Sequence, residues 1–136
     1  YMTAQVAEQV LAAGESVLGG RSQNVTVLFS DIRGFTGIAE RLGAQETVSL
    51  LNEYFTEMVE IVFEHQGILD KYIGDAIMAV FGAPFASPRD ADNAVKVAIR
   101  MQRALAAFNA RRRAQGQAEL EVRIGINSGD VVAGNI

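Results

Sequence analysis

The chain has 136 residues, which fits one domain and leaves little room for a second. Hydrophobic residues make up 49% of the sequence and charged residues 21%, which argues against disorder and predicts a packed core. The formal net charge of −4 argues against a general affinity for nucleic acid. No apolar run reaches the ~18 residues of a membrane span.

The sequence contains no cysteine and only one histidine, His65. Disulfides, thiolate nucleophiles and cysteine-bound zinc or iron–sulfur clusters are therefore excluded. Any metal site must be built mainly from carboxylate and carbonyl oxygens, which favours a hard cation such as Mg²⁺ or Mn²⁺. The absence of cysteine also fits the cytoplasmic location that we expect.

The N-terminal part of the chain is expected to lead into a strand. Residues 1–24, in which glycines interrupt a short helical pattern, are expected to form a connector. Residues 25–29 are rich in β-branched and aromatic side chains and predict the first strand. This strand ends at Ser30 and Asp31, before the turn-prone pair Arg33 and Gly34.

A long amphipathic helix and a hairpin follow. Residues 46–65 carry apolar side chains at intervals of three and four residues, which is typical of a helix. These apolar positions are Val48, Leu51, Phe55, Met58 and Val62. His65 and Gly67 suit the end of this helix. Residues 68–73 and 76–81 predict two strands, joined by a tight turn at Gly74 and Asp75.

The remaining segments predict a second long helix and a last strand. Residues 87–90 resemble a capping box with proline at the first helical position. The helix has its apolar positions at Ala94, Ala98, Met101, Leu105 and Phe108. It ends in three consecutive arginines, at positions 111–113, which need no ligand to explain them. Residues 119–127 alternate between polar and apolar side chains and predict a strand at the edge of a sheet.

The order of these elements is βαββαβ, which predicts an α+β, ferredoxin-like fold: a four-stranded antiparallel sheet with two helices on one face. The expected strand order is 4-1-3-2, so the end of the first strand lies beside the start of the third. Asp31 and Asp75 therefore come together at one end of the sheet. Two close carboxylates repel each other unless a cation is present, and divalent ions satisfy both charges.

Simpler interpretations exist for each carboxylate. Asp31 is also suited to cap a short helix that begins near Phe35, and Asp75 is a common type of turn residue. Taken together, their placement favours a metal site suited to in-line phosphoryl or nucleotidyl transfer. The turn at Gly34 leads into a helix whose backbone N–H groups suit phosphate oxygens, although one glycine is a weak signal.

Three segments in order resemble the motifs of the class III nucleotidyl cyclase catalytic domain. They are FSDIRGFT at residues 29–36, DKYIGDA at residues 70–76 and RIGINSG at residues 123–129. The resemblance covers roughly residues 25–136. It implies that Asp31, Asp75 and the Ile32 carbonyl bind two Mg²⁺ or Mn²⁺ ions per site. It also implies that the backbone of residues 34–36, which are Gly34, Phe35 and Thr36, holds a triphosphate.

The same resemblance implies a substrate and a reaction. The lysine at the position of Lys71 reads adenine in the family, where guanylyl cyclases commonly place glutamate, so Lys71 favours ATP. An ammonium group donates to adenine N1, whereas a carboxylate accepts from the guanine N1–H. Arg123 matches an arginine that contacts the phosphates. The implied reaction is attack of the ribose 3′ oxygen on the α-phosphorus, which yields cyclic AMP and pyrophosphate.

The family works as a head-to-tail dimer, so the resemblance implies a homodimer with composite sites in which Asp31 and Asp75 face the partner's Lys71. Sensor or regulatory domains upstream are also implied. The family continues beyond the position of Ile136 with groups that bind adenine and orient the ribose, so the expected catalytic domain, residues 25–136, is incomplete at its C-terminus. The alternatives are a guanylyl cyclase, a noncatalytic nucleotide-binding or dimerisation module of the same fold, and a small ligand-sensing domain.

Overall fold

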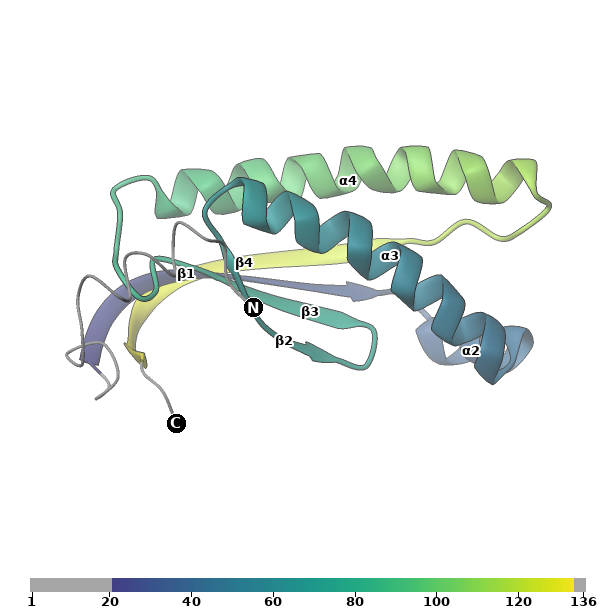
Figure 1. The fold of residues 1–136 in the computed structure, drawn as a ribbon, viewed down its shortest axis with the longest axis horizontal. Coiled ribbons are helices and arrows are strands. Elements are labelled where there is room, and N and C mark those ends of the chain that lie inside the picture. The colour runs from purple at the N-terminus through teal and green to yellow at the C-terminus, as the bar shows by residue number, and fades with distance from the viewer. Residues whose placement is uncertain (1–20, 134–136) are drawn as a thin grey trace.

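A computed structural model describes residues 21–133 as one four-stranded antiparallel sheet with three helices. The elements in chain order are β1 (Arg21–Ile32), α2 (Phe35–Leu42), α3 (Ala44–Glu64), β2 (Ile68–Ile73), β3 (Ala76–Phe81), α4 (Asp90–Ala114) and β4 (Val122–Ala133). Figure 1 shows α3 and α4 on the same side of the sheet, with α2 beyond the end of β1. The predicted α+β fold is confirmed, with α2 as an additional short helix.

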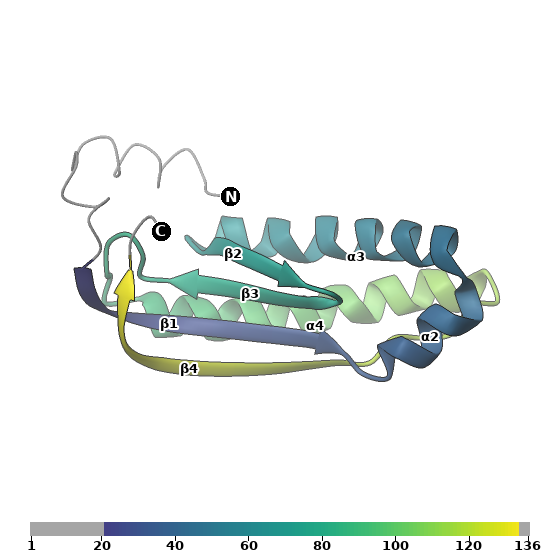
Figure 2. The same cartoon turned by 90° about the horizontal axis from the view of Figure 1, so that it is seen from below.

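The strands lie in the order β2-β3-β1-β4, which is the predicted order read from the opposite edge (Figure 2). All neighbouring strands are antiparallel. The bounds of β2 and β3 are the predicted ones, and Gly74 in the turn between them has a positive φ of 62°. Glycine adopts this left-handed conformation without the strain that a Cβ causes.

The two long strands differ from their predicted bounds. The ladder between β1 and β4 runs from the pair Arg21↔Ala133 to the pair Ile32↔Val122. The last four residues of the predicted connector therefore belong to β1, and residues 1–20 lie outside the described part of the chain. Side-chain propensity misses these ends because their residues are mostly polar or small, whereas the ladder is held by backbone hydrogen bonds.

The core lies between the sheet and the two long helices, and its fully buried side chains include Leu28, Tyr54 and Ile77. The expected apolar stripe of α4 is buried at four of its five positions, and Ala98 packs against its edge. On α3 one expectation is wrong, because Val48 is 58% exposed. The buried stripe of α3 instead includes Tyr54, which a count of apolar residues alone leaves out.

The ends of α4 are held by contacts within the chain. The Ser87 amide donates to Asp90 Oδ2 at 2.7 Å and the Arg89 amide donates to Ser87 Oγ at 3.2 Å, although the helix itself begins at Asp90. At the other end, Arg111 pairs with Glu57. The next two arginines bond to Ala118 O and Glu119. These partners fit the expectation that the three arginines need no ligand. Within the described residues, no helix is both long and apolar enough to cross a membrane.

Candidate active site

The end of β1 directs alternate side chains to opposite faces of the sheet. Leu28, Ser30 and Ile32 are buried beneath the helices. Phe29 is 39% exposed and the Asp31 side chain 34% exposed, so both lie on the face that the helices leave open. Asp31 is therefore accessible at the end of a central strand.

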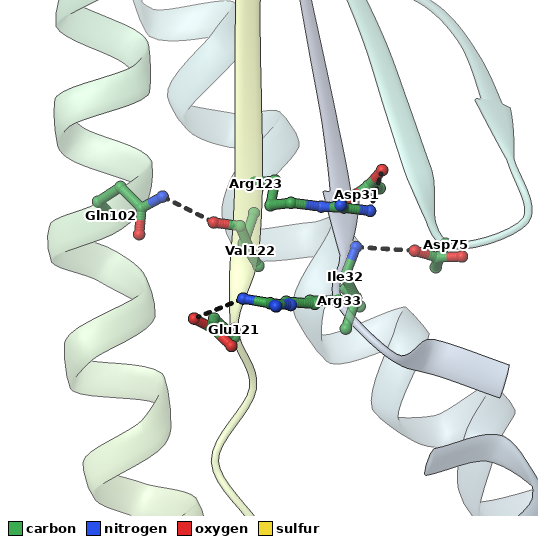
Figure 3. Close-up of polar contacts among 8 residues, drawn as sticks. All are labelled: Asp31, Ile32, Arg33, Asp75, Gln102, Glu121, Val122 and Arg123. Carbon is green, nitrogen blue, oxygen red and sulfur yellow. Dashed lines mark hydrogen bonds and ion pairs between the residues drawn. The ribbon is translucent and has the colours of Figure 1, made fainter. Parts of the chain in front are cut away.

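Asp75 lies in the turn between β2 and β3, beside the same end of β1. Its Oδ2 accepts a hydrogen bond from the Ile32 amide at 2.7 Å (Figure 3). Because Ile32 directly follows Asp31, this bond brings the two carboxylates to one end of the sheet, as the topology predicts. Asp75 is thus both a turn residue and a partner of β1.

The structure does not support the interpretation of Asp31 as a helix cap. The N-cap of α2 is Gly34, and no side chain of the described residues caps this helix. Gly34 has φ 66° and ψ 27°, a left-handed conformation in which any other side chain is strained. The first turn of α2, which begins with Phe35 and Thr36, therefore offers backbone N–H groups and the positive end of the helix dipole beside the carboxylates.

Arg123 pairs directly with Asp31. The two residues are opposite each other in the β1–β4 ladder. Arg123 Nε lies 3.1 Å from Asp31 Oδ1, and Arg123 Nη2 lies 3.3 Å from Oδ2. Next to this pair, Arg33 contacts Glu121 at 3.6 Å (Figure 3). In this structure Arg123 balances the charge of Asp31, and its predicted contact with phosphates stays a prediction.

Lys71 reaches the open face through a β-bulge. Leu69 pairs with Ala79 and Lys71 with Met78, so Asp70 is an extra residue between them. The extra residue shifts the alternation of side chains between the two faces of the sheet. The shift is visible at Tyr72, whose ring stacks on Phe55 of α3 on the helix side, with centroids 4.2 Å apart. Lys71 therefore lies on the face opposite to Tyr72.

Within one chain, Lys71 is not brought to the carboxylates. It pairs with Asp70 at 3.3 Å and is exposed. Two strand spacings, about 10 Å, separate β2 from β1. Lys71 and Asp31 thus share a face of the sheet without contacting each other.

His65 does not belong to this site. It is the C-cap of α3, at the end of the hairpin opposite to Asp75. Its Nε2 lies 3.0 Å from Arg100 Nη1, and burial together with Arg100 lowers the pKa of the imidazole. This placement agrees with the prediction that His65 lies at the end of the helix.

The donor set at the sheet end fits a hard divalent cation that is shared with a phosphate ligand. In the described part of the chain, no group of three or more histidine or acidic side chains forms a metal cage. Asp31, Asp75 and the Ile32 carbonyl would supply only part of a coordination shell. Mg²⁺ is commonly bound by one or two carboxylates, with water and substrate phosphates completing the shell.

Two buried hydroxyls, which sequence analysis missed, lie behind the site. Ser30 and Tyr54 are fully buried, and neither hydroxyl has a hydrogen-bond partner within residues 21–133. Burial raises the pKa of Tyr54 to about 12; the facing Ser30 hydroxyl opposes this shift, and the carboxylates of Asp75 and Asp31 add to it. The Ser30 hydroxyl is thus near the phenol, although their geometry falls outside that of a hydrogen bond. The only signal in the sequence was the polar hydroxyl of Tyr54 among the apolar residues of α3.

The raised pKa of Tyr54 predicts a loss of stability at alkaline pH. The unfolded chain releases the phenol proton near pH 10, whereas the folded chain keeps it until about pH 12, so stability falls as the pH rises between these values. At pH 11 this loss is about 1.4 kcal/mol, the equivalent of one pKa unit. Between pH 9 and pH 11, the free energy of unfolding of the wild type should fall by about 1.4 kcal/mol more than that of Tyr54→Phe, as measured by urea unfolding. Equal losses in both proteins would contradict the shift.

The fold, the paired carboxylates and the helix beside them, which has no side-chain cap, define a nucleotidyl cyclase type of domain. The sequence pattern of the family described as "Adenylate and Guanylate cyclase catalytic domain" matches residues 18–136. The chain belongs to this family.

Two curated adenylate cyclases are similar to the chain. It is 35% identical over its whole length to adenylate cyclase 1 of Rhizobium meliloti (strain 1021), of which it covers 21%. It is 40% identical to an adenylate cyclase of Anabaena cylindrica, over 85% of this chain and 23% of that protein. The chain thus spans about a fifth of the length of these curated relatives.

Solved structures confirm the fold. The adenylyl cyclase CyaB from P. aeruginosa superposes with a TM-score of 0.82 at 40% identity, over 86% of this chain and 61% of that one. The guanylyl cyclase Cya2 superposes with a TM-score of 0.81 at 43% identity, over 86% of this chain and 59% of that one. These two similarities are nearly equal, so overall likeness does not separate ATP from GTP as the substrate.

Proposed function

We propose that this chain is the catalytic domain of an adenylyl cyclase, which converts ATP into cyclic AMP and pyrophosphate. The observation that carries the proposal is the hydrogen bond from the Ile32 amide to Asp75, which holds Asp31 and Asp75 at one end of the sheet beside α2. In this proposal the two carboxylates and the Ile32 carbonyl hold Mg²⁺ or Mn²⁺, two ions per site.

The residues around the carboxylates have separate roles in this proposal. When bound, the ions would lower the pKa of the ribose 3′ hydroxyl and neutralise charge on the phosphates. Backbone N–H groups from Gly34 to Thr36 bind the triphosphate at the positive end of α2. Arg123, which pairs with Asp31 here, would contact phosphate oxygens in the complex in which Asp31 holds the ions.

Lys71 favours ATP rather than GTP as the substrate in this proposal. Its ammonium group is a donor that matches adenine N1 and cannot accept a hydrogen bond from the guanine N1–H. The bulge at Asp70 presents this ammonium on the open face, where a base can reach it. Guanylyl cyclase activity is the alternative, and the substrate preference of Lys71 variants distinguishes the two.

The open face also supports a composite site formed by a homodimer. Asp31 and Lys71 lie on this face on strands that are two strand spacings, about 10 Å, apart, together with the exposed apolar side chains of Phe29 and Ile73. A two-fold axis through this face brings Lys71 of each protomer opposite the partner's Asp31, and it produces two equivalent sites. Because the chain spans only about a fifth of the length of its curated relatives, sensor domains elsewhere in the protein are part of the proposal. A cytoplasmic location is also part of the proposal.

Mixing two impaired variants of the full-length protein tests the proposed function and the composite site together. We expect the wild type to form cyclic AMP from ATP with Mn²⁺, Asp31→Ala to abolish this activity, and Lys71→Glu to reduce it about 10-fold or more through the loss of one charged hydrogen bond. In a 1:1 mixture, half of the dimers contain both variants, and one of their two sites then has wild-type residues on both sides. Activity should return to about a quarter of the wild-type value.

The alternatives give different results in this experiment. No recovery in the mixture, with mixed dimers verified by differential tags, would contradict the composite site. Absence of cyclic AMP formation by the wild type would contradict the proposed activity itself and favour a guanylyl cyclase or a noncatalytic module.

A further inference from the structure

We propose that Ser30 and Tyr54 are positioning residues, whose buried hydroxyls set the placement of the carboxylates that bind the metal ions. This inference rests on the proposed function, because it concerns the same site. It assigns a role to two side chains that lie behind the sheet rather than on its open face. Neither residue contacts the substrate in this proposal.

Three consecutive residues of β1 connect the hydroxyls to the site. The Ser30 side chain is buried in the core beneath the helices, Asp31 carries one carboxylate, and the Ile32 amide donates to Asp75 Oδ2 at 2.7 Å. Any displacement of this tripeptide therefore moves both carboxylates at once. Ser30 is the residue of the three whose polar side chain points into the core, so it is the one that α3 can restrain.

Tyr54 is placed to provide that restraint. Its ring is fully buried and packs against Phe55 of the same helix, with centroids 5.7 Å apart, and edge-on against Phe108 of α4, with centroids 6.2 Å apart. These contacts pack the ring against aromatic side chains of both long helices. The hydroxyl of Tyr54 is near Ser30 and within electrostatic reach of both carboxylates. α3 thus presents a buried polar atom towards the end of β1.

The energetics of the two hydroxyls favour a linked pair. A buried hydroxyl without a partner is costly, and most such groups in folded proteins have a protein or water partner. A small adjustment, or one water between the two oxygens, satisfies both hydroxyls. Groups of this kind behind a metal site typically change metal affinity 10- to 100-fold when they are removed.

A purely structural role predicts a different outcome. If the hydroxyls only occupy space in the core, replacing both with apolar groups of similar shape is neutral or stabilising and leaves metal binding unchanged. If they position the carboxylates, their removal weakens metal binding even where stability is maintained. Metal affinity therefore separates the two roles.

The experiment measures Mn²⁺ binding to the full-length protein without nucleotide, by electron paramagnetic resonance of the free ion. The variants are Tyr54→Phe, Ser30→Ala and the double variant, with Ser30→Thr as the conservative variant that keeps a hydroxyl. We expect a loss of affinity of about 10-fold in each single variant and no further loss in the double variant, because the two hydroxyls act as one unit. Ser30→Thr should stay within about twofold of the wild type.

Thr26→Val is the matched control. Thr26 is a buried hydroxyl on the same strand, 2% exposed, and it bonds to Ser128 at 2.8 Å away from the carboxylates. It should reduce stability without changing Mn²⁺ affinity. Urea unfolding of every variant checks that the fold is retained.

The outcomes separate this inference from the proposed function. Mn²⁺ binding that is lost in Asp31→Ala but unchanged in Tyr54→Phe and Ser30→Ala would overturn the positioning role alone. Additive losses in the double variant would also overturn the idea of one linked unit. A wild-type protein that binds no Mn²⁺, or binds it equally well as Asp31→Ala, would overturn the metal assignment and the inference with it.

Discussion

Asp31→Ala is expected to abolish cyclic AMP formation, with a loss of at least about 10³-fold. The proposed ions contribute several kcal/mol of charge stabilisation, and each 1.36 kcal/mol corresponds to a factor of about ten in rate. Asp75 alone cannot replace this charge, because one of its oxygens already accepts the Ile32 amide. The rate of cyclic AMP formation from ATP with Mn²⁺, in the full-length protein, is the measurement.

The same substitution should leave the fold nearly unchanged. Asp31 is on the open face, and its ion pair with Arg123 involves an arginine side chain that is 67% exposed. Exposed ion pairs of this kind contribute about 0–1 kcal/mol to stability. Circular dichroism and urea unfolding should therefore show a protein close to the wild type.

Asp130→Ala is the control for the loss of one carboxylate from the same sheet. Asp130 is exposed on β4 and bonds to Asn24 at 3.2 Å, at the opposite end of the β1–β4 ladder from Asp31. It should keep wild-type activity. Activity that survives in Asp31→Ala, or is equally lost in Asp130→Ala, would refute the assignment of Asp31.

Most of the fold was predictable because it depends on patterns that are local in sequence. The hairpin of β2 and β3 has the predicted bounds, because a glycine-containing turn separates two short strands. The meeting of Asp31 and Asp75 followed from strand order alone, and the structure bears it out through the Ile32 amide. Where backbone pairing extends a strand through polar residues, as in residues 21–24 of β1, side-chain pattern carries no signal.

The parts of the site that were missed depend on contacts between distant residues. The pairing of Arg123 with Asp31 requires the register between β1 and β4, and that register is set by a ladder longer than either predicted strand. The bulge at Asp70 reverses the face on which Lys71 lies, and simple alternation from the buried Leu69 gives the wrong side. The approach of Tyr54 to Ser30 depends on how α3 packs over the sheet.

Lys71→Glu is expected to shift substrate preference from ATP towards GTP. The ammonium group loses its hydrogen bond to adenine N1, and the new carboxylate accepts from the guanine N1–H instead. One charged hydrogen bond contributes about 1.5–3 kcal/mol, so the ratio of kcat/KM for ATP to that for GTP should fall about 10- to 100-fold. Parallel assays of cyclic AMP formation from ATP and cyclic GMP formation from GTP measure this ratio in the full-length protein.

The structure makes this substitution a clean test of specificity. The Lys71 side chain is 57% exposed and its one described ion pair is with the adjacent Asp70, so its replacement should cost little stability. The chain contains one other lysine, Lys96, which is exposed on α4 and is the matched control. Lys96→Glu should leave the ratio unchanged. An unchanged ratio in Lys71→Glu would remove the argument for ATP, because the bulge on β2 then presents a lysine that no base contacts.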